Sequence, residues 1–475
     1  MKILYAASEC KPFAASGGLG DVVGSLPQAL RQKKVSVRVV LPLYGSIKQE
    51  YRDKMTFLKA IYVPVAWRRQ YCGIFEYRGD GVIYYFLDNE YYFKRDSLYG
   101  YYDDAERFAF FSRAVLEIIP AVDFKPDIIS CNDWQTALVP VYYSTMYSKG
   151  GGYYSNIKTV FTIHNIQYQG KYGDEVLENV IGLSPFDKSI VEYDGCVNYM
   201  KGAIESSDKV STVSPTYAEE ILDPWYSYGL DTILKMRSWK LKGILNGISY
   251  DVYNPETDKH LWANYSVDNL SGKKTDKEEL QKYFNLPLKK DTPIVAMVSR
   301  LVSHKGFDLV QGIIEEFIRY FDVQFIVLGS GDWQYEQFFR DLAGRYPDKV
   351  GLYLGYVPDL AQKIYAGSDI FLMPSKSEPC GLSQMIALRY GSVPVVRETG
   401  GLADSIKDSG MGTGNGFVFT NYNAHEMKHA LERAVEGYKD KEGWQILMKR
   451  AMNCDFSWDR SAQEYIDMYK SLIGQ

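Results

Sequence analysis

The chain has 475 residues, of which 46% are hydrophobic and 24% are charged, a balance typical of folded globular proteins. This length exceeds what one hydrophobic core usually supports, so two large domains are expected. The formal net charge of −5 provides no basic field for a polyanion, and nucleic acid is therefore excluded as an expected partner.

The cysteines and the apolar segments indicate a reducing, aqueous compartment. The six cysteines are scattered and form no C-x-x-C pair, which argues against a disulfide framework. The apolar run that starts at Ile3 is far too short for a signal peptide, and no window approaches the roughly 18 apolar residues of a membrane helix. We therefore expect a cytoplasmic protein with no membrane partner.

Short apolar runs, each followed by a loop and a helical pattern, recur along both halves of the chain. In the first half they are Lys2–Ala7, Val35–Leu41, Asp127–Ser130 and Lys158–Ile163. In the second half they are Ile294–Val298, Gln324–Leu328, Asp369–Met373 and Val393–Val396. This alternation predicts parallel strands joined by helices, so we expect an α/β fold of two doubly wound, Rossmann-like domains.

The boundary between the domains is predicted from a change of composition. Residues 251–291 are richer in Asn, Asp, Lys and Pro and contain no clear strand, which places the hinge near Asn246–Asn254. The tail from Asp455 has a helical pattern suited to packing across a domain face. We predict domains at 1–247 and 248–454 that face each other across a cleft, and a helix at 455–475 that crosses back to the first domain.

The loop after the first strand is rich in glycine and precedes a helix that starts at Val22. Gly17 and Gly18 allow a ligand to approach the backbone closely, and amides at the start of a helix favour an anion. A tight turn without a ligand is the alternative. The glycine spacing is one residue longer than the dinucleotide fingerprint, and no acidic residue ends the second strand at Leu41 to hold a ribose.

Polar residues also follow the third and fourth strands of the first half. Asp133 and Trp134 lie in one such loop, and the alternative to a ligand contact there is an aspartate that caps the next helix beside a core tryptophan. His164 ends a buried strand, at the edge of a parallel sheet where ligands bind. A lone histidine is more often structural than catalytic.

In the second half, two cations follow the first strand. Arg300 and Lys305 lie five residues apart before a helix, where charge-assisted hydrogen bonds can hold a diphosphate. Further along, Glu378 lies where a strand ends and a helix begins, and Gly400 and Gly401 form a second glycine pair after a strand.

In this order, the loops resemble those of the bacterial glycogen synthases and plant starch synthases, retaining glycosyltransferases of family 5 with the GT-B fold. The matching segments are Ser-Gly-Gly-Leu-Gly-Asp from Ser16, Asn-Asp-Trp from Asn132, Thr-Ile-His-Asn from Thr162, Asn-Gly-Ile from Asn246, Ser-Arg-Leu from Ser299 with Lys-Gly from Lys305, Gly-Tyr from Gly355, Glu-Pro-Cys-Gly-Leu from Glu378 and Thr-Gly-Gly-Leu from Thr399. The resemblance spans essentially the whole chain.

The resemblance implies a role for these positions. The catalytic residues would be His164, Glu378, Arg300, Lys305 and Asp133. The substrate-binding positions would be Gly17, Gly18, Asp21, Asn165, Asn246, Tyr356, Cys380, Gly381, Leu382, Thr399, Gly400 and Gly401.

Within this set, His164 would contact the transferring glucose, and Glu378 would hold the glucose ring or stabilise positive charge at its anomeric carbon. Asp133 would act on acceptor or glucose hydroxyls. The amides of Cys380–Leu382 would face the donor, Thr399–Gly401 would cradle the distal phosphate, and Tyr356 would stack on the base.

Several positions depart from the family pattern. Ala15 stands where the family has a lysine associated with the donor phosphates, and Lys11 is the cation we consider as its substitute. Gln135 replaces a histidine of the N-D-W-H-T motif, and Ser249 replaces the aspartate of N-G-I-D. Related families carry a second glutamate where this chain has Ile386, so only one carboxylate is credited.

The resemblance implies glucose transfer from ADP-glucose to the non-reducing end of an α-1,4-glucan, with retention of configuration. The first domain would mainly hold the α-1,4-glucan or maltooligosaccharide acceptor, and the second the nucleotide-diphosphate glucose. We expect no cofactor beyond this donor substrate. We also expect no metal, because the chain has no D-x-D motif and its cations can neutralise the diphosphate.

Three other functions remain open at this point. UDP-glucose is an alternative donor. A glucan-binding protein with weak or lost transfer is suggested by Ala15 and by the clustered tyrosines. A nicotinamide dehydrogenase is disfavoured by the glycine spacing and the missing ribose acid.

One further motif matches a zinc-protease pattern. His425-Glu-Met-Lys-His429 satisfies H-E-x-x-H, but Met427 and Leu431 define one helix face and the two histidines project from the opposite one. Because a buried catalytic zinc needs the reverse arrangement and a third ligand, we predict an ordinary surface helix here.

Overall fold

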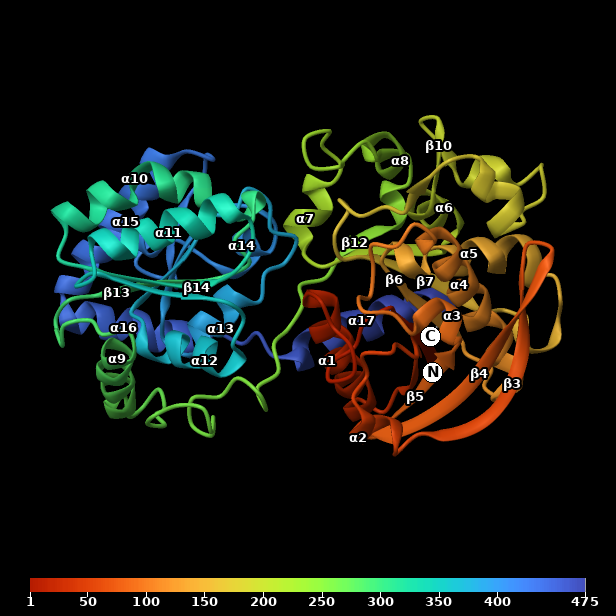
Figure 1. The fold of residues 1–475 in the computed structure, drawn as a ribbon, viewed down its shortest axis with the longest axis horizontal. Coiled ribbons are helices and arrows are strands. Elements are labelled where there is room, and N and C mark those ends of the chain that lie inside the picture. The colour runs from red at the N-terminus through yellow and green to blue at the C-terminus, as the bar shows by residue number, and fades with distance from the viewer. Residues whose placement is uncertain (475) are drawn as a thin grey trace. The chain divides into compact units, whose positions relative to one another are not determined.

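A computed structural model describes residues 1–474 of the chain (Figure 1). The chain divides into two compact units. Unit 1 comprises residues 1–246 together with the C-terminal segment from Trp458, and unit 2 comprises Gly247–Ser457. Each unit is built around its own main sheet, with helices packed on it.

Unit 1 contains a nine-stranded sheet with the strand order β12-β11-β7-β6-β1-β2-β5-β4-β3. Its strands are β1 (Lys2–Ala6), β2 (Ser36–Pro42), β3 (Thr56–Val65), β4 (Arg68–Gly79), β5 (Val82–Asp88), β6 (Ile128–Asn132), β7 (Lys158–Ile163), β11 (Lys209–Thr212) and β12 (Leu241–Gly243). The strands from β12 to β5 run parallel. The four strands predicted for the first half are β1, β2, β6 and β7, so that prediction is confirmed.

The antiparallel edge of this sheet was not predicted. Strands β3 and β4 form a long hairpin that continues into β5. Strand β3 contains Pro64 and is mostly exposed, and β4 contains several polar and charged residues, so neither matches the buried apolar runs on which our prediction relied. Unit 1 also has a small sheet of β8 (Lys171–Tyr172), β10 (Cys196–Asn198) and β9 (Glu192–Tyr193).

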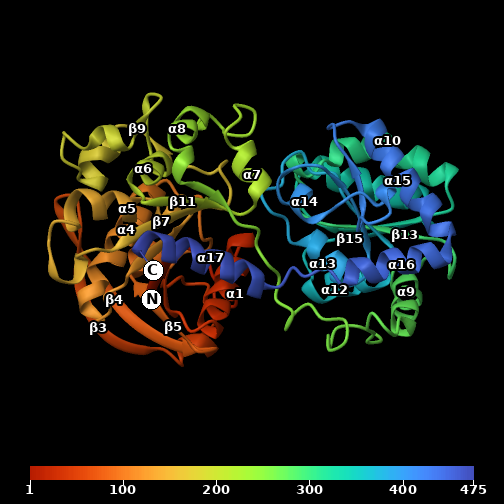
Figure 2. The ribbon, with the colours of Figure 1, turned by 180° about the vertical axis from the view of Figure 1, so that it is seen from behind.

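The helices of unit 1 include the last helix of the chain. They are α1 (Gly18–Gln32), α2 (Gln49–Arg52), α3 (Glu90–Phe93), α4 (Asp104–Ala121), α5 (Leu138–Tyr142), α6 (Tyr199–Ser206), α7 (Pro215–Glu220), α8 (Asp231–Met236) and α17 (Trp458–Ile473). Helix α17 packs beside α1 (Figure 2). The Tyr469 hydroxyl lies 3.2 Å from Ser130 Oγ, and Ser461 Oγ donates to the Leu245 carbonyl at 2.6 Å.

Unit 2 contains a six-stranded parallel sheet with the order β15-β14-β13-β16-β17-β18. Its strands are β13 (Ile294–Val298), β14 (Gln324–Gly329), β15 (Val350–Leu354), β16 (Ile370–Met373), β17 (Val393–Arg397) and β18 (Phe417–Phe419). The four strands predicted for the second half are β13, β14, β16 and β17, which confirms the prediction.

The helices of unit 2 cover both faces of this sheet. They are α9 (Ser271–Tyr283), α10 (Phe307–Tyr320), α11 (Trp333–Arg345), α12 (Pro358–Gly367), α13 (Ser383–Arg389), α14 (Gly400–Ser405), α15 (Ala424–Lys439) and α16 (Lys441–Met452). Figure 1 shows α10 and α11 on one face and α12 and α13 on the other. The segment 251–291, for which we predicted no strand, contains α9.

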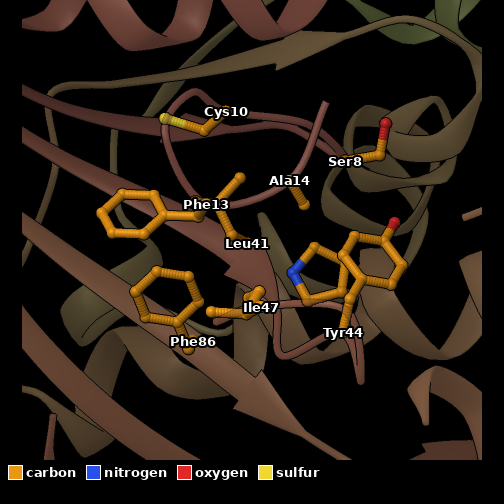
Figure 3. A pocket seen from close by; sticks show the side chains of 9 residues that line it. Ser8, Cys10, Phe13, Ala14, Leu41, Tyr44, Ile47 and Phe86 are labelled. Carbon is orange, nitrogen blue, oxygen red and sulfur yellow. The ribbon is translucent and has the colours of Figure 1, made fainter. Parts of the chain in front are cut away.

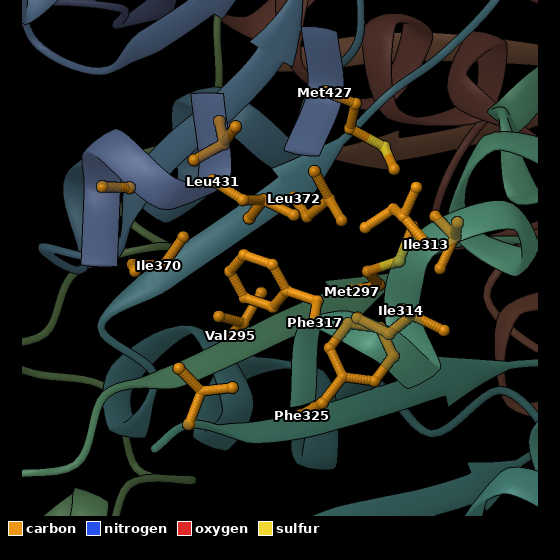
Figure 4. Packing of buried hydrophobic residues seen from close by; sticks show 14 of the residues in the cluster. Val295, Met297, Ile313, Ile314, Phe317, Phe325, Ile370, Leu372, Met427 and Leu431 are labelled. Carbon is orange, nitrogen blue, oxygen red and sulfur yellow. The ribbon is translucent and has the colours of Figure 1, made fainter. Parts of the chain in front are cut away.

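The apolar face of α10 closes one core of unit 2. Its buried residues Ile313, Ile314 and Phe317 pack against strand residues such as Val295 and Met297 (Figure 4). Fully burying each side chain of this size stabilises the fold by about 1.5–3 kcal/mol. The strand ends that carry the predicted second-half site are therefore attached to a well-packed layer.

Two findings bear on the compartment and on metal binding. Within residues 1–474 no helix combines the length and apolarity needed to cross a membrane. Helix α15 buries Met427, Leu431 and Ala434 while His425 and His429 are exposed, so the surface-helix prediction for the H-E-x-x-H segment is confirmed.

Candidate active site

The glycine-rich loop after β1 rests on a buried aromatic side chain. Phe13 packs edge-on against the rings of Tyr51, Tyr84 and Phe86, with centroids 5.2, 5.2 and 5.0 Å away. Figure 3 shows Phe13 beside Leu41 and Phe86. Each such pair contributes about 0.5–1.5 kcal/mol beyond area burial, so the base of the loop is held in place.

Gly17 and Gly18 face open space. A Cβ built at either position meets no atom within 4 Å, and Gly17 has an extended backbone with φ −160°. By contrast, a Cβ at Gly20 would lie 2.4 Å from the Cβ of Ala15. The fold itself therefore requires glycine at Gly20 but not at Gly17 or Gly18, as expected if a ligand approaches the backbone there.

A buried carboxylate already occupies part of this loop. Glu9 is 5% exposed, and its Oε2 accepts hydrogen bonds from the amides of Ser16 (2.5 Å) and Gly17 (3.1 Å). The hydroxyls of Ser16 and Tyr99 donate to Oε1 at 2.7 and 2.8 Å. The expectation that the loop amides are free for an anion is thus corrected for Gly17, whose amide holds Glu9.

The cation considered as a substitute at the family lysine position makes an internal contact. Lys11 Nζ lies 2.6 Å from Asp21 Oδ1, and both side chains are partly exposed. Ala15 is exposed on the same loop. The positive charge of Lys11 beside the glycines is therefore paired with Asp21.

Asp133 caps the loop after the neighbouring strand. Its Oδ1 accepts from the amides of His164 (2.7 Å) and Asn165 (3.3 Å), and its φ of 56° lies in the left-handed region. Burial raises the pKa of Asp133 to about 7, against the effect of those two amides. Its carboxylate holds the His164 loop. The alternative, in which this aspartate caps the helix that follows it, is wrong, because its side chain forms no cap hydrogen bond there.

Trp134, the neighbour of Asp133, belongs to the core. It is 9% exposed and packs on the rings of Phe108 and Tyr199, with centroids 5.0 and 6.5 Å away. A Cβ at Gly170 would lie 2.7 Å from the Trp134 ring, so this glycine is required by packing. The alternative in which Trp134 is a core residue is therefore confirmed.

The hydrogen bond to Asn132 fixes the tautomer of the His164 ring. Its Nε2 lies 2.9 Å from Asn132 Oδ1, while Asn132 Nδ2 donates to the Ala6 carbonyl at 3.0 Å. Because Asn132 offers an acceptor to the ring, His164 Nε2 must carry the proton and Nδ1 must be the free acceptor. Burial lowers the pKa of His164 to about 3, so the ring is neutral at pH 7.

Two asparagines complete the predicted positions of unit 1. Asn165 Oδ1 accepts from the amide of Gln167 at 3.0 Å and closes a turn. Asn246 is 4% exposed, and its Oδ1 has no hydrogen-bond partner within residues 1–474. Leaving a buried polar atom unsatisfied costs about 1–3 kcal/mol. This cost favours a binding role for Asn246 over a purely structural one.

In unit 2 the predicted catalytic residues Lys305 and Glu378 form an ion pair. Lys305 Nζ lies 2.6 Å from Glu378 Oε2, and Ser375 Oγ donates to the same oxygen at 2.9 Å. Their side chains are 18% and 7% exposed. The pair forms because β13 and β16 are adjacent parallel strands, so the loops at their carboxyl ends meet.

Arg300 lies in the same loop as Lys305 and is exposed. Its guanidinium forms no ion pair or hydrogen bond with any residue of the described chain. His304 lies between the two cations, and burial and the charge of Lys305 lower its pKa to about 4. The loop thus presents two fixed positive charges without a third from the imidazole.

The loop after β16 directs two amides outward. Gln384 Nε2 donates to the carbonyls of Cys380 (3.0 Å) and Gly381 (2.9 Å). In a trans peptide the carbonyl and the next amide point in opposite directions, so the amides of Gly381 and Leu382 face away from Gln384. Neither amide donates to a residue described in the structure.

The second glycine pair packs directly on this loop. Gly400 has φ 44°, and a Cβ there would lie 2.0 Å from the Glu378 carbonyl oxygen. The Gly401 amide donates to that same oxygen at 3.1 Å, and Thr399 is fully buried. The amide of Gly401 is therefore occupied, and both glycines are required for close packing behind Glu378.

The remaining predicted position, Tyr356, follows β15. Its ring is 74% exposed, and the preceding residue, Gly355, donates its amide to the Gly329 carbonyl at 3.0 Å. The tyrosine is thus held by its backbone and is free to stack on a flat group.

Comparison with known proteins identifies the family. Residues 2–236 match the family described as starch synthase catalytic domain, and residues 278–446 match glycosyl transferases group 1. The glycogen synthases of Geobacillus thermodenitrificans and Bacillus cereus are 51% and 52% identical over 477 aligned residues, covering all of this chain and 98% and 100% of theirs. The chain belongs to the glycogen and starch synthase family.

Solved structures agree with this assignment. The catalytic domain of starch synthase IV from Arabidopsis thaliana, bound to ADP and acarbose, superposes with a TM-score of 0.92 and 37% identity, covering 100% of this chain and 99% of that one. Sucrose-phosphate synthase from Thermosynechococcus elongatus, at 17% identity and a TM-score of 0.62, shares the fold. The predicted family and the GT-B fold of two Rossmann-like domains are confirmed, and this glycogen and starch synthase relative is a glucosyltransferase.

Some site residues were not found from the sequence. Glu9, Asn132, Ser375 and Gln384 each hold a predicted residue or loop through a side-chain hydrogen bond. Asn132 begins the Asn-Asp-Trp segment, and Ser375 and Gln384 flank the Glu-Pro-Cys-Gly-Leu segment, so the resemblance marked the position of all three. Glu9 has no periodic or glycine pattern that would have marked it.

Proposed function

We propose that the chain transfers glucose from ADP-glucose to the non-reducing end of an α-1,4-glucan and retains the anomeric configuration. Support for the donor comes from the Arabidopsis starch synthase domain that was solved with ADP and acarbose. Support for the polymer comes from the glycogen synthases that match over the full chain. In this proposal unit 2 mainly holds the nucleotide sugar and unit 1 mainly holds the acceptor.

The observation that carries the proposal is the combination of charge and amides around Glu378. Lys305 Nζ contacts its carboxylate, and a Cβ at Gly381 would lie 3.0 Å from its Cγ. The outward amides of Gly381 and Leu382 therefore lie next to a carboxylate and an ammonium. An arrangement of fixed donors beside one carboxylate suits a diphosphate leaving group next to a positively charged sugar.

The proposed reaction uses these groups as follows. The bond between the anomeric carbon and the diphosphate breaks, and the diphosphate takes the electron pair. Lys305 and Arg300 balance the charge that develops on it, while Glu378 and the neutral ring of His164 hold the glucose. The acceptor hydroxyl attacks from the same face and passes its proton to the departing phosphate, which retains the configuration.

We further propose that neither a cofactor nor a metal takes part and that the protein acts in the cytoplasm. Activity in the presence of EDTA should equal activity without it, because Arg300 and Lys305 supply the positive charge. Restoration of lost activity by Mg²⁺ would contradict this part of the proposal.

The test is to incubate the chain with ADP-glucose or UDP-glucose and a maltooligosaccharide, and to separate the products by chain length. We expect one-glucose extensions with ADP-glucose and little product with UDP-glucose. The variant Glu378→Gln is the control and should give almost none.

A second candidate is a glucan-binding protein with lost transfer, which Ala15 favours because it removes a cation from the exposed glycine loop. Glycogen binding without release of nucleotide from either donor would support this candidate and contradict the transferase.

A further inference from the structure

A groove on unit 2 lies apart from the residues assigned to the transfer reaction. It has a volume of about 630 Å³ and lies along β15, the edge strand of the sheet, between the end of α9 and the end of α11. Tyr283, Tyr353, Arg340 and Asp348 are among the residues that line it. Its volume falls within the range of about 300–1,000 Å³ that is usual for ligand sites.

The groove runs along the edge strand, from Pro347 and Asp348 before β15 to Tyr353 near its carboxyl end. In the sheet, β14 lies between β15 and β13, and β16 lies on the far side of β13. A ligand in the groove would therefore lie at the edge of the sheet, separated by β14 from β13 and β16, whose loops carry Lys305 and Glu378.

Aromatic rings form part of the groove walls. Tyr283 is 48% exposed and Tyr353 is 36% exposed, and neither phenol hydroxyl forms a hydrogen bond with a residue in the described part of the chain. Phe284 also lines the groove and covers Gly351, where a Cβ would lie 2.8 Å from its ring. Flat rings with polar tips suit the apolar face and the hydroxyls of a sugar ring.

The polar groups of the groove favour an uncharged, hydroxyl-rich ligand. Arg340 and Asp348 carry opposite charges, so the groove does not select for an anion or a cation. Arg340 is half exposed, and its contact with Glu336 is long, at 3.4 Å. Asn285 is exposed, and its φ of 54° holds it in a fixed turn at the groove wall. Planar amide, guanidinium and carboxylate groups can each bind two neighbouring hydroxyls.

We propose that this groove binds a chain of α-1,4-glucan as a second, non-catalytic site. The inference rests on the proposed function, in which the acceptor is a polymer with many chain ends. Binding one chain in the groove makes the capture of another chain by the catalytic site intramolecular, which raises its effective concentration. The groove thus tethers the enzyme to the particle that it extends.

The test compares retention by glycogen with catalysis on a short acceptor. We would substitute Tyr283→Ala and Tyr353→Ala together in the full chain, and use Tyr320→Ala as the matched control, because Tyr320 is 79% exposed on α10 of the same unit. In gels that contain glycogen, we expect the double variant to bind about tenfold more weakly and the control to bind like the wild type. Activity on maltotriose should stay unchanged in both.

Other outcomes would overturn the proposal. Equal retention of the double variant and the wild type would contradict it, as would an equal loss in the control. Asp348→Lys, which leaves the rings in place, should also weaken retention if the double variant does not fold. Retention by glycogen needs no donor and no turnover. If the groove retains the protein on glycogen but no glucose is transferred, the proposed activity is wrong and the proposed groove site still stands.

Discussion

Lys305 and Glu378 illustrate how a nearly buried ion pair serves a reaction. With side chains 18% and 7% exposed, the two charges lose most of their hydration and depend on each other and on Ser375. Lys305 has three N–H donors, so binding Glu378 leaves others for a phosphate oxygen. The pair therefore keeps Glu378 oriented before any substrate binds.

The pair can be tested by a double-mutant cycle on stability. Lys305→Met leaves the Glu378 carboxylate buried without its cation, and we expect a loss of about 3 kcal/mol in the free energy of unfolding. The double variant Lys305→Met/Glu378→Gln should recover more than half of that loss, because no unpaired charge remains. Urea unfolding measures all four proteins. Additive losses in the double variant would show that the two side chains are not coupled.

The neutral ring of His164 predicts how stability changes with pH. In the folded chain its pKa is about 3, whereas a histidine in an unfolded chain has a pKa of about 6.5. Below pH 6.5 the unfolded state therefore binds the additional proton. This contribution to stability is fully present above pH 6.5 and is lost as the pH falls toward 3.

We expect the wild type to lose roughly 1–2 kcal/mol more than His164→Gln when the pH is lowered from 8 to 5. Urea unfolding at both pH values gives the difference directly. Because glutamine keeps a side-chain donor for Asn132 and does not titrate, it is the appropriate reference. If the difference in unfolding free energy between the wild type and His164→Gln is the same at both pH values, the ring in the folded chain is protonated or exposed.

At the scale of the element, the loop between β16 and α13 depends on one buried side chain. Gln384 is fully buried and holds the carbonyls of Cys380 and Gly381 as well as Ser405 Oγ. This fixes the direction of the Gly381 and Leu382 amides. The geometry of the donor site is therefore a property of the loop and of the first turn of α13 together.

Gln384→Met keeps the volume of the side chain but removes its donors. We expect the KM for ADP-glucose to rise about tenfold or more, with a stability loss of about 1–3 kcal/mol from the unsatisfied carbonyls. Gln337→Met is the control, since Gln337 donates to Asp341 one turn further along the same helix, α11. Steady-state kinetics with varied donor measures the effect. An unchanged KM would mean that the amides do not bind the donor.

At the scale of the whole molecule, the end of the chain completes unit 1. Helix α17 follows unit 2 in the sequence, yet its buried residues Trp458, Tyr465 and Tyr469 belong to unit 1. The stability of unit 1 thus depends on a segment that is made only after all of unit 2.

Tyr469→Ala should lower the stability of unit 1 by about 3–5 kcal/mol, because it empties a fully buried site. In calorimetry we expect one unfolding transition to move to lower temperature while the other stays in place. Lys470→Ala, an exposed neighbour on the same helix, should change neither. A uniform shift of both transitions would show that the units do not unfold separately.

The sequence by itself determined the local elements and the positions of the motifs. Continuous apolar runs predicted eight parallel strands, because a strand buried on both faces needs apolar residues at every position. The order of the loops predicted the family and the residues His164, Lys305 and Glu378. Strands β3 and β4 were missed because β3 contains a proline and is mostly exposed, and β4 mixes polar with apolar residues.

The tertiary structure alone decided which of these residues meet and which amides are free. Lys305 and Glu378 are 73 positions apart and pair because β13 lies beside β16, which no local periodicity encodes. Glu9 fills part of the first glycine loop and Glu378 engages the second through its backbone, although both loops look alike as glycine pairs in the sequence. Contacts of this kind depend on the order of strands in the sheet and on the path of each loop, and both are set by packing across the whole unit.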